Sequence, residues 1–434
     1  MTHPEQTFAP NHNLPATDFE ALDLRGQSYD DLTQFMQRLG EKRYRGEQLF
    51  RWIHARGATT LADMTDVSAK LRARLQTDGL VRVGTLGLDK VQLAQDGTRK
   101  LRFVTQDQRL LESVLIPDDD ARQWATLETE KRPGPEAGPD PGPDPDDDSD
   151  PDDDGPWERK KLTQCVSSQV GCVLDCAFCA TAKLGFGRNL TTGEMVSQIY
   201  QAEAFLRGLP ADDPTRLSGG DAVTNLVFMG MGEPLHNFEA LLQTLRILLH
   251  PLGRNFSRRR ITVSTAGLVP GIAKLAASGI GVNLAVSLNA TRDEVRNHLM
   301  PINRTYPLSR LLSVLRDFPL DRRQRITIEY VLLKGVNDSL DDARRLPELL
   351  RGIPVKLNLI PWNPHPEADF QRPEKQTVAA FQAECMRLGF TTYVRKTRGD
   401  DISAACGQLA AENDPRATKV RKRLLPVIPW KPTP

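Results

Sequence analysis

The second part of the chain, from Lys161 onward, alternates short runs of β-branched residues with helical stretches. We expect strands at residues 225–229, 261–265, 282–287, 326–332, 356–360 and 391–394. Helices are expected between them, at residues 193–206, 238–248, 268–277, 339–350 and 377–388. Repeated strand–helix units build a parallel sheet or barrel, with its active site at the carboxyl ends of the strands. The pattern therefore predicts an α/β fold over residues 161–410.

A small helical region precedes the barrel region. Within residues 26–80, apolar side chains recur at the spacing of a helix face, as at Leu32, Phe35, Met36 and Leu39. The polar side of this region is rich in Lys and Arg, which either contact RNA or form an ordinary solvated face. We therefore predict a helical accessory domain, with RNA binding as one of two interpretations.

Residues 81–117 change to strand periodicity. The dipeptide Asp96-Gly97 is a typical hairpin turn, and it separates the apolar runs 91–93 and 100–104. A third strand is expected at residues 111–116. This region is predicted to be a short β extension of the fold.

Three segments have a composition that does not favour folding. Residues 1–25 lack an apolar core and a basic start, so we expect a disordered lead, no secretory signal and a cytoplasmic protein without a membrane span. Residues 118–160 include a tract, 133–156, with ten acidic residues, eight prolines and no basic residue. With these ten charges set aside, the formal net charge of +1 becomes +11, which suits a polyanion such as RNA or a merely basic enzyme surface. Residues 411–434 form a basic tail.

Three cysteines, Cys172, Cys176 and Cys179, follow one another with the spacing C-x3-C-x2-C. One loop can place such a set around a metal centre. Structural zinc sites and ordinary four-iron ferredoxin sites use four protein ligands, so a set of three leaves one position open for a substrate. A zinc site completed by Cys165 or Cys406 is the alternative interpretation.

This spacing, with Phe178 just before the last cysteine, resembles the radical S-adenosylmethionine superfamily. The resemblance implies a [4Fe-4S] cluster held by Cys172, Cys176 and Cys179, with its open iron chelated by S-adenosylmethionine. A second motif, Gly232-Glu233 followed by proline, comes just after the apolar strand at 225–229. We expect the small residues there to let the backbone approach a bound amino acid, and Glu233 to accept from its ammonium group.

The flanking strings make the resemblance closer. From about residue 24 to residue 424, apart from the insert, the chain is similar to the RlmN-type dual-specificity RNA methyltransferases, through CVSSQVGC at 165–172, GFGRNL at 185–190, IPWNP at 360–364, VRKTRGDDI at 394–402 and AACGQL at 404–409. This family implies a partial (β/α)6 TIM-like barrel that methylates carbon 2 of adenine. Its substrates are 23S ribosomal RNA, at the peptidyl-transferase centre, and tRNA, at the adenine 3′ of the anticodon.

Two other functions stay open at this point. The related enzyme that methylates carbon 8 of the ribosomal adenine shares all five key cysteines. A non-catalytic RNA-binding protein that holds zinc is the alternative from a different class.

The resemblance also assigns catalytic roles. Cys406 would be methylated by one S-adenosylmethionine, and a radical from a second molecule would remove a hydrogen atom from that methyl group. The resulting carbon would add to adenine, Glu112 would take the ring proton, and Cys165 would attack the sulfur of Cys406 to release the product. On the strand at 111–116 Glu112 has apolar neighbours on its face, and basic residues at 395, 396 and 398 are expected to lower the pKa of Cys406.

The remaining implied contacts concern the cofactor and the partners. S-adenosylmethionine would be held by residues of four segments, namely Gly232, Glu233, Ser264, Ser287, Leu288, Asn289 and Asn363. At Asn289 the family often has His, so a contact there would have to come from the backbone. The superfamily also implies an electron donor of the flavodoxin type. The acidic insert between Glu112 and Cys165 is longer than the usual connection, which puts the position of Glu112 in question.

Overall fold

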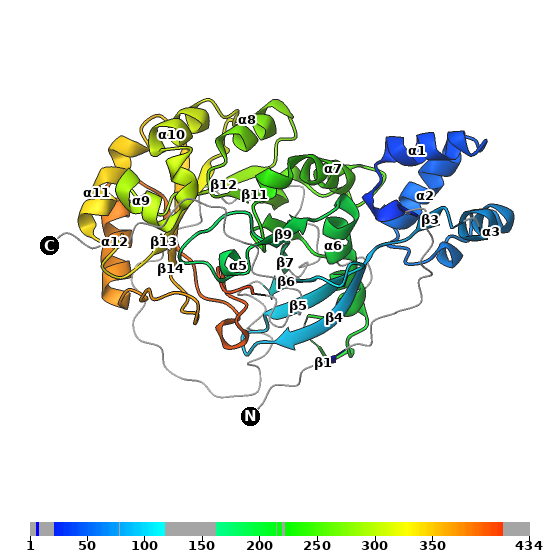
Figure 1. Cartoon of the computed structure of the whole chain (residues 1–434), viewed down its shortest axis with the longest axis horizontal. Helices are drawn as coiled ribbons and strands as arrows, with labels where there is room; N and C mark the ends of the chain where they lie inside the picture. The colour runs from blue at the N-terminus through cyan, green and yellow to red at the C-terminus, as the bar shows by residue number, and fades with distance from the viewer. Residues whose placement is uncertain are drawn as a thin grey trace, which may run out of the picture.

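One sheet of eleven strands runs through the molecule, in the order β1-β4-β5-β6-β7-β10-β11-β12-β13-β14-β15 (Figure 1). The computed structural model describes residues 6–7, 21–77, 79–117, 162–213, 215–218 and 222–410. The predictions for most of the lead, for residues 118–160 and for the tail therefore lie outside the described residues. Neighbouring strands are parallel throughout the barrel part, which comprises β7 (Leu162–Cys165), β10 (Asn225–Phe228), β11 (Ile261–Thr265), β12 (Asn283–Ser287), β13 (Ile326–Leu332), β14 (Val355–Pro361) and β15 (Thr392–Val394).

Helices follow the parallel strands and cover the outside of the sheet (Figure 1). They are α6 (Thr192–Arg207), α7 (Phe238–Leu249), α8 (Val269–Ala277), α9 (Asp293–Leu299), α10 (Leu308–Arg316), α11 (Leu340–Leu349) and α12 (Lys375–Arg387). The expected strands and helices of this part are all present, with ends shifted by a few residues at most. The succession of strand–helix units confirms the predicted α/β partial barrel. Among the described residues, every helix is too short or too polar to span a membrane.

The first barrel strand, β7, was not predicted. It has only four residues, and Thr163 and Gln164 interrupt its apolar pattern. Its strand conformation comes from its neighbours, because β10 pairs with it on one side and β6 (Leu110–Pro117) on the other. Helices α9 and α10 were also missed.

The β extension continues the barrel sheet. Strands β4 (Leu86–Leu93), β5 (Arg99–Thr105) and β6 form an antiparallel meander, as the Asp96-Gly97 turn predicts. Strand β6 then pairs antiparallel with β7, with Val114 opposite Cys165. Pro117 and Leu162, which flank the insert, are also paired, so the insert leaves and re-enters on adjacent strands.

The N-terminal region is helical, with α1 (Tyr29–Arg38), α2 (Tyr44–His54) and α3 (Ala69–Thr77). Of the predicted apolar stripe, Leu32 and Met36 are fully buried. The region is anchored to the barrel by two buried polar contacts. The His54 ring nitrogen Nδ1 lies 2.9 Å from the hydroxyl of Tyr200 on α6, and Arg25 donates to Ser197 Oγ at 3.3 Å. The predicted domain boundaries remain predictions.

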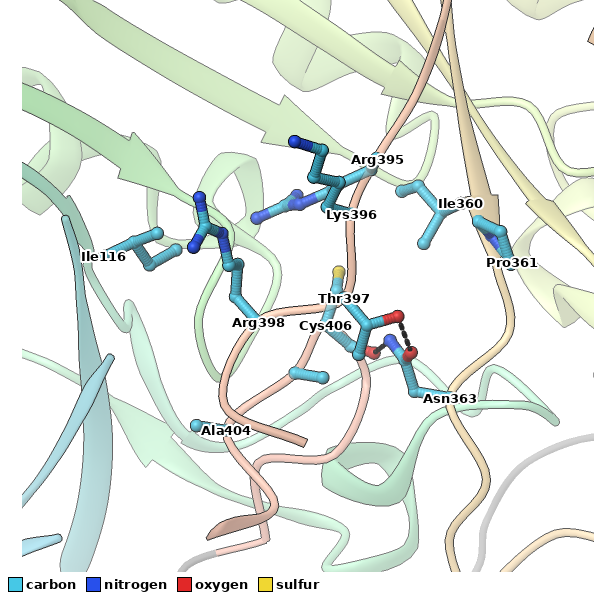
Figure 2. A pocket seen from close by; sticks show the side chains of 11 residues that line it. Ile116, Ile360, Pro361, Asn363, Arg395, Lys396, Thr397, Arg398, Ala404 and Cys406 are labelled. Atoms are coloured by element: carbon cyan, nitrogen blue, oxygen red, sulfur yellow. Dashed lines mark hydrogen bonds between the residues drawn. The ribbon is translucent and has the colours of Figure 1, made fainter. Parts of the chain in front are cut away.

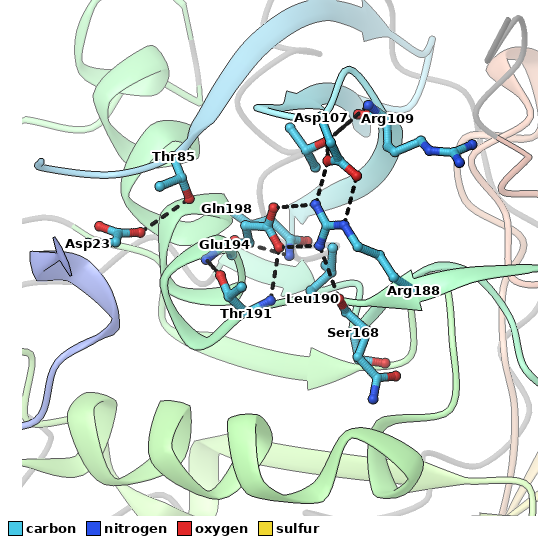
Figure 3. Close-up of polar contacts among 12 residues, drawn as sticks. Asp23, Thr85, Asp107, Arg109, Ser168, Arg188, Leu190, Thr191, Glu194 and Gln198 are labelled. Atoms are coloured by element: carbon cyan, nitrogen blue, oxygen red, sulfur yellow. Dashed lines mark hydrogen bonds and ion pairs between the residues drawn. The ribbon is translucent and has the colours of Figure 1, made fainter. Parts of the chain in front are cut away.

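A small hairpin and a charged clamp flank the cysteine loop. Strands β8 (Gln169–Gly171) and β9 (Phe186–Asn189) pair antiparallel on either side of the loop and of the short helix α5 (Ala180–Lys183). The guanidinium of Arg188 lies between Asp107 and Glu194, at 2.6 Å and 2.7 Å (Figure 3). The hydrogen bonds from Arg188 hold the pKa of Asp107 well below its ordinary value. The clamp ties the hairpin to the turn after β5 and to the start of α6.

Candidate active site

The loop between β8 and α5 carries all three cysteines of the C-x3-C-x2-C set. Both of its ends and its middle are fixed by hydrogen bonds. The Cys172 amide donates to the Gly185 carbonyl at 2.9 Å, and the Ala177 amide donates to Leu299 at the end of α9 at 2.9 Å. The Phe178 carbonyl accepts from Trp362 Nε1 at 3.0 Å and lies 2.9 Å from His365 Nε2. The loop that precedes Cys179 is therefore held from three directions.

The three thiols lie close together and are not oxidised. None of them forms a disulfide. Burial raises the pKa of Cys172 and Cys176, and in each case the neighbouring thiols of the set raise it further. Among the described residues, no group of three His, Cys, Asp or Glu side chains is arranged to hold a single metal ion. Three neighbouring free thiols on one loop supply the thiolate donors that an iron–sulfur cluster takes as ligands.

Glu233 lies next to this set of thiols. It follows β10, and its carboxylate accepts from the Leu235 amide at 3.1 Å and the Ala266 amide at 2.8 Å. Burial raises the pKa of Glu233 to about 7, and its charge acts on Cys172 and Cys176. The Thr265 side chain is a third partner, and a carboxylate has about four acceptor sites, so Glu233 retains the capacity to bind an ammonium group.

The glycines before Glu233 have a packing role within the protein, and the expected approach of the backbone to a ligand stays a prediction. A Cβ on Gly232 would lie 2.6 Å from the side chain of Gln169, and a Cβ on Gly230 would lie 2.6 Å from Ser167 Oγ. Gly232 also has a φ of 104°, in the region that favours glycine. The small residues are therefore required by the chain's own packing after β7, and an approach to a ligand is not needed to explain them.

The ends of β11 and β12 bring the next predicted residues to the same edge of the sheet. Ser264 Oγ lies 3.3 Å from Glu329 Oε2, and the Leu288 amide donates to the Glu329 carbonyl at 2.9 Å. Asn289 is fully buried, and its side-chain oxygen accepts from the Val331 amide at 2.8 Å. Its side chain is thus committed to the neighbouring strand, and its carbonyl accepts from Asn337 Nδ2 at 2.7 Å.

Cys406 lines a small pocket (Figure 2). Asn363 holds the loop that carries it, since Asn363 Nδ2 donates to the Cys406 carbonyl at 3.2 Å and Thr397 Oγ1 donates to Asn363 Oδ1 at 3.1 Å. The lining residues come from β6, β14 and the segment after β15: Ile116, Ile360, Pro361, Asn363, Arg395, Lys396, Thr397, Arg398, Ala404, Ala405 and Cys406. The wall is strongly basic, as a site for part of an RNA requires.

The expected low pKa of Cys406 is wrong. Burial raises the pKa of Cys406 to about 11, although the nearby positive charge of Arg395 opposes this shift. Burial likewise raises the pKa of Cys165 to about 12, and the charge of Cys406 raises it further. The basic residues near Cys406 were counted correctly, but the sequence did not reveal that the thiol is enclosed. The effect of the Cys406 charge on the pKa of Cys165 places these two cysteines near each other.

Glu112 lies on the same side of the sheet as the Cys406 segment. Contrary to what the sequence indicates, its neighbours are not only apolar. Its carboxylate lies 3.4 Å from Lys100 Nζ and accepts from the Ala410 amide at 3.1 Å, just beyond Cys406. Glu112 and Lys100 are both buried. Next to Glu112, the Ser113 hydroxyl donates to the Cys165 carbonyl at 2.7 Å. Strand pairing thus fixes Glu112 beside Cys165 and the Cys406 loop, whatever the length of the insert.

Several residues at this edge were not predicted. Lys100, Arg296 and Glu329 belong to strands or helices that carry no motif. For Lys100 the predicted hairpin gives no direct signal, because the strand register places Arg102 across from Glu112 and Lys100 across from Val114. For Arg296 and Glu329 we find no local signal, because only the folded barrel brings them to the site.

Comparison with known proteins identifies two families within the chain. Residues 22–81 match the family described as the ribosomal RNA large subunit methyltransferase N-terminal domain. Residues 166–346 match the radical SAM superfamily. The second match spans the cysteine loop and the strands up to β13.

Whole-chain relatives agree with these matches. The chain is 44% identical over 393 residues to the dual-specificity RNA methyltransferase RlmN of Geobacter sulfurreducens, covering 91% of this chain and 93% of the relative. It is 46% identical to the protein of the same name from Sorangium cellulosum, over 85% of this chain and 90% of the relative. A solved radical SAM methyltransferase from Sphaerobacter thermophilus matches with a TM-score of 0.75 and 38% identity, over 90% of this chain and 100% of that one. The chain therefore belongs to the RlmN family of dual-specificity RNA methyltransferases, within the radical SAM superfamily.

Proposed function

We propose that this protein methylates carbon 2 of adenine in 23S ribosomal RNA, at the peptidyl-transferase centre, and in tRNA, at the adenine 3′ of the anticodon. The observation that carries the proposal is that Cys165 and Glu112 lie beside the segment of Cys406, which lines a basic pocket next to the three-cysteine loop. As a radical SAM enzyme, the protein uses a [4Fe-4S] cluster and S-adenosylmethionine.

The target carbon explains why cysteines are needed in addition to the cluster. Carbon 2 of adenine is electron-poor and has no acidic proton, so it cannot act as the nucleophile in a direct methyl transfer. The cluster and two molecules of S-adenosylmethionine per turnover supply the methyl group and a carbon-centred radical. The protein must then hold the methyl group on its own side chain while the base is brought to it.

The residues at the carboxyl ends of the barrel strands would bind two different groups, the cluster and S-adenosylmethionine. Three thiols, Cys172, Cys176 and Cys179, would hold the cluster. The cofactor would contact Gly232, Glu233, Ser264, Ser287, Leu288, Asn289 and Asn363, of which Glu233 is suited to its ammonium group because of its burial and position. Leu288 and Asn289 would contribute mainly packing, since both carbonyls and the Asn289 side chain already accept hydrogen bonds within the protein.

The catalytic residues would act in sequence on one methyl group. Cys406 loses its proton, with Arg395 favouring the thiolate, and accepts the methyl group. After a hydrogen atom is removed from that group, its carbon bonds to adenine and joins the protein to the RNA. Glu112 would take the proton from carbon 2, and the unpaired electron of the adduct would return to the cluster that supplied it. The Cys165 thiolate would then attack the sulfur of Cys406, so that a sulfur–sulfur bond forms and the sulfur–carbon bond breaks. The electron pair of that bond stays with the product, whose carbon takes up a proton.

The partners follow from the same proposal. Phosphate contacts from the N-terminal helices, the pocket wall and the basic tail would position the RNA, while the pocket selects the base. A flavodoxin-type protein would deliver the electrons, and the enzyme would work in the cytoplasm.

Mass spectrometry of nucleosides tests the proposal. The protein is reconstituted under anaerobic conditions and incubated with S-adenosylmethionine, a reductant and either 23S ribosomal RNA or tRNA from cells that lack the modification. We expect 2-methyladenosine from both RNAs. Formation of 8-methyladenosine would assign the carbon-8 reaction instead, and the absence of any methylated adenosine from a protein that contains the cluster would contradict the proposal.

A further inference from the structure

Arg296 on α9 is fully buried and lies behind the cofactor edge of the barrel. Its guanidinium donates to the carbonyls of Ala266 at 2.7 Å, Leu288 at 2.9 Å and Ser287 at 3.1 Å. A fourth bond, at 2.8 Å, goes to the side-chain oxygen of Asn303. One side chain thus ties the end of β11 to the end of β12.

These carbonyls belong to the segments that would hold S-adenosylmethionine. Ser287 and Leu288 are themselves expected cofactor contacts. Ala266 accepts from Arg296 through its carbonyl and donates from its amide to Glu233, at 2.8 Å. Arg296 is therefore connected through a single residue, Ala266, to the carboxylate suited to the cofactor's ammonium group.

The charge of Arg296 is not neutralised by its hydrogen bonds, because all four acceptors are uncharged. Asp293, one turn earlier, acts on Arg296 at a distance, but its Oδ1 accepts from Asn303 and from the Leu308 amide. Burying a cation without a close anion is costly. An additional anionic group close to this guanidinium would remove that cost.

Cys176 is the group next to Arg296 that would carry such charge. The side chain of Cys176 packs in an apolar cluster with Val295 and Leu299, the residues on either side of Arg296 along α9. The positive charge of Arg296 acts to lower the pKa of Cys176, and the negative charge of the Cys176 thiolate acts to raise the pKa of Arg296. With three thiolates, a [4Fe-4S] cluster is anionic, and more so after reduction.

We propose that Arg296 is a positioning residue that locks the cofactor-binding ends of β11 and β12 together and places a buried positive charge beside the cluster ligand Cys176. The inference rests on the proposed placement of cluster and cofactor. It implies two separable effects. The positive charge of Arg296 favours the reduced state of the cluster. The hydrogen bonds from its guanidinium group hold the residues that would bind S-adenosylmethionine in place.

Two substitutions separate these effects. Arg296→Gln removes the charge, so the midpoint potential of the reconstituted cluster should become more negative, and binding of S-adenosylmethionine should weaken about tenfold or more because charge-assisted hydrogen bonds are lost. Arg296→Lys keeps the charge but cannot span the carbonyls of two strands. It should leave the potential close to that of the wild type and weaken binding as in Arg296→Gln.

A matched control comes from Arg254, a mostly buried arginine that pairs with Glu203 away from this edge. Arg254→Gln should lower thermal stability but leave both the potential and the binding of S-adenosylmethionine unchanged. Equal shifts in Arg254→Gln and Arg296→Gln, or unchanged values in Arg296→Gln, would overturn the inference. A wild-type protein that forms no cluster would overturn the proposed function as well, so the two failures are distinguishable.

Discussion

Two groups of cysteines meet at the carboxyl edge of the barrel, and the chain assembles them in different ways. Cys172, Cys176 and Cys179 lie on a single loop, so their proximity is written into their spacing. Cys165 ends the first barrel strand, whereas Cys406 lies beyond the last strand. Their proximity depends on the whole barrel and on the hydrogen bond from Asn363 that holds the Cys406 loop.

The two groups also differ in the charges around them. Burial raises the pKa of the thiols in both groups. Next to Cys406 the protein provides Arg395, whose charge partly offsets burial. Around the three-cysteine loop Glu233 adds negative charge and Arg296 supplies a single buried cation. The comparison suggests that metal ions complete the first group, whereas a side chain activates the second.

The largest effect is expected from removing the thiol of the second group. Cys406→Ala should abolish RNA methylation, since Cys406 is the one thiol among the described residues that line the pocket, while the absorption of the iron–sulfur cluster stays unchanged. Mass spectrometry of the RNA and visible spectroscopy of the protein measure the two quantities. Cys385→Ala is the control, because Cys385 is fully buried on α12 and should leave both unchanged. Methylated RNA from Cys406→Ala would show that Cys406 is not the residue that carries the methyl group.

Removing the other thiol of the pair should stop the reaction at a different point. With Cys165→Ala the sulfur–carbon bond to the product cannot be broken by thiolate attack, so protein and RNA should remain covalently joined. A denaturing gel of the reaction with labelled RNA would show the adduct. If RNA migrates freely after Cys165→Ala, Cys165 is not the residue that releases the product.

The role of Arg395 predicts a graded effect. Arg395→Gln removes the charge that opposes burial, so the pKa of Cys406 should rise above its value of about 11. Below that pKa, the thiolate fraction falls about tenfold for each unit of increase in pKa, and alkylation of Cys406 by iodoacetamide should slow accordingly. Site-resolved mass spectrometry follows the rate from pH 7 to pH 9, where the rate should still rise with pH. Arg395→Lys should be closer to the wild type. An unchanged rate in Arg395→Gln would show that the guanidinium does not act on this thiol.

A smaller effect, on the stability of the protein, is expected from a substitution of Gly232, which packs against Gln169 next to the cysteine loop. Gly232→Ala should lower the free energy of unfolding by about 1–3 kcal/mol, because its Cβ would overlap Gln169 and its φ is positive. Gly335→Ala is a matched control, with a φ of 68° and no atom within 4 Å of its Cβ. Chemical denaturation compares the two. Equal losses would mean that backbone strain alone accounts for the requirement, without the contact with Gln169.

Features carried by neighbouring residues could be predicted from the sequence, whereas those made by the fold could not. The β-branched runs located most of the barrel strands, and the cysteine spacing located the cluster loop. Strand β7 was missed because its pairing partners are distant in the sequence. The same reason hid the contact between Lys100 and Glu112 and the carbonyls around Arg296. The pKa of Cys406 was misjudged because nearby charges can be read from a sequence and enclosure cannot.

The most direct test of the central claim follows one methyl group labelled with deuterium. The reconstituted protein is incubated with S-adenosylmethionine carrying a fully deuterated methyl group, and both the Cys406 peptide and the methylated adenosine are analysed by mass spectrometry. The account predicts three deuterium atoms on the Cys406 methyl group and two of them in the methyl group of the product, because one is lost before the carbon joins adenine. Three deuterium atoms in the product, or an unlabelled Cys406 peptide, would contradict it.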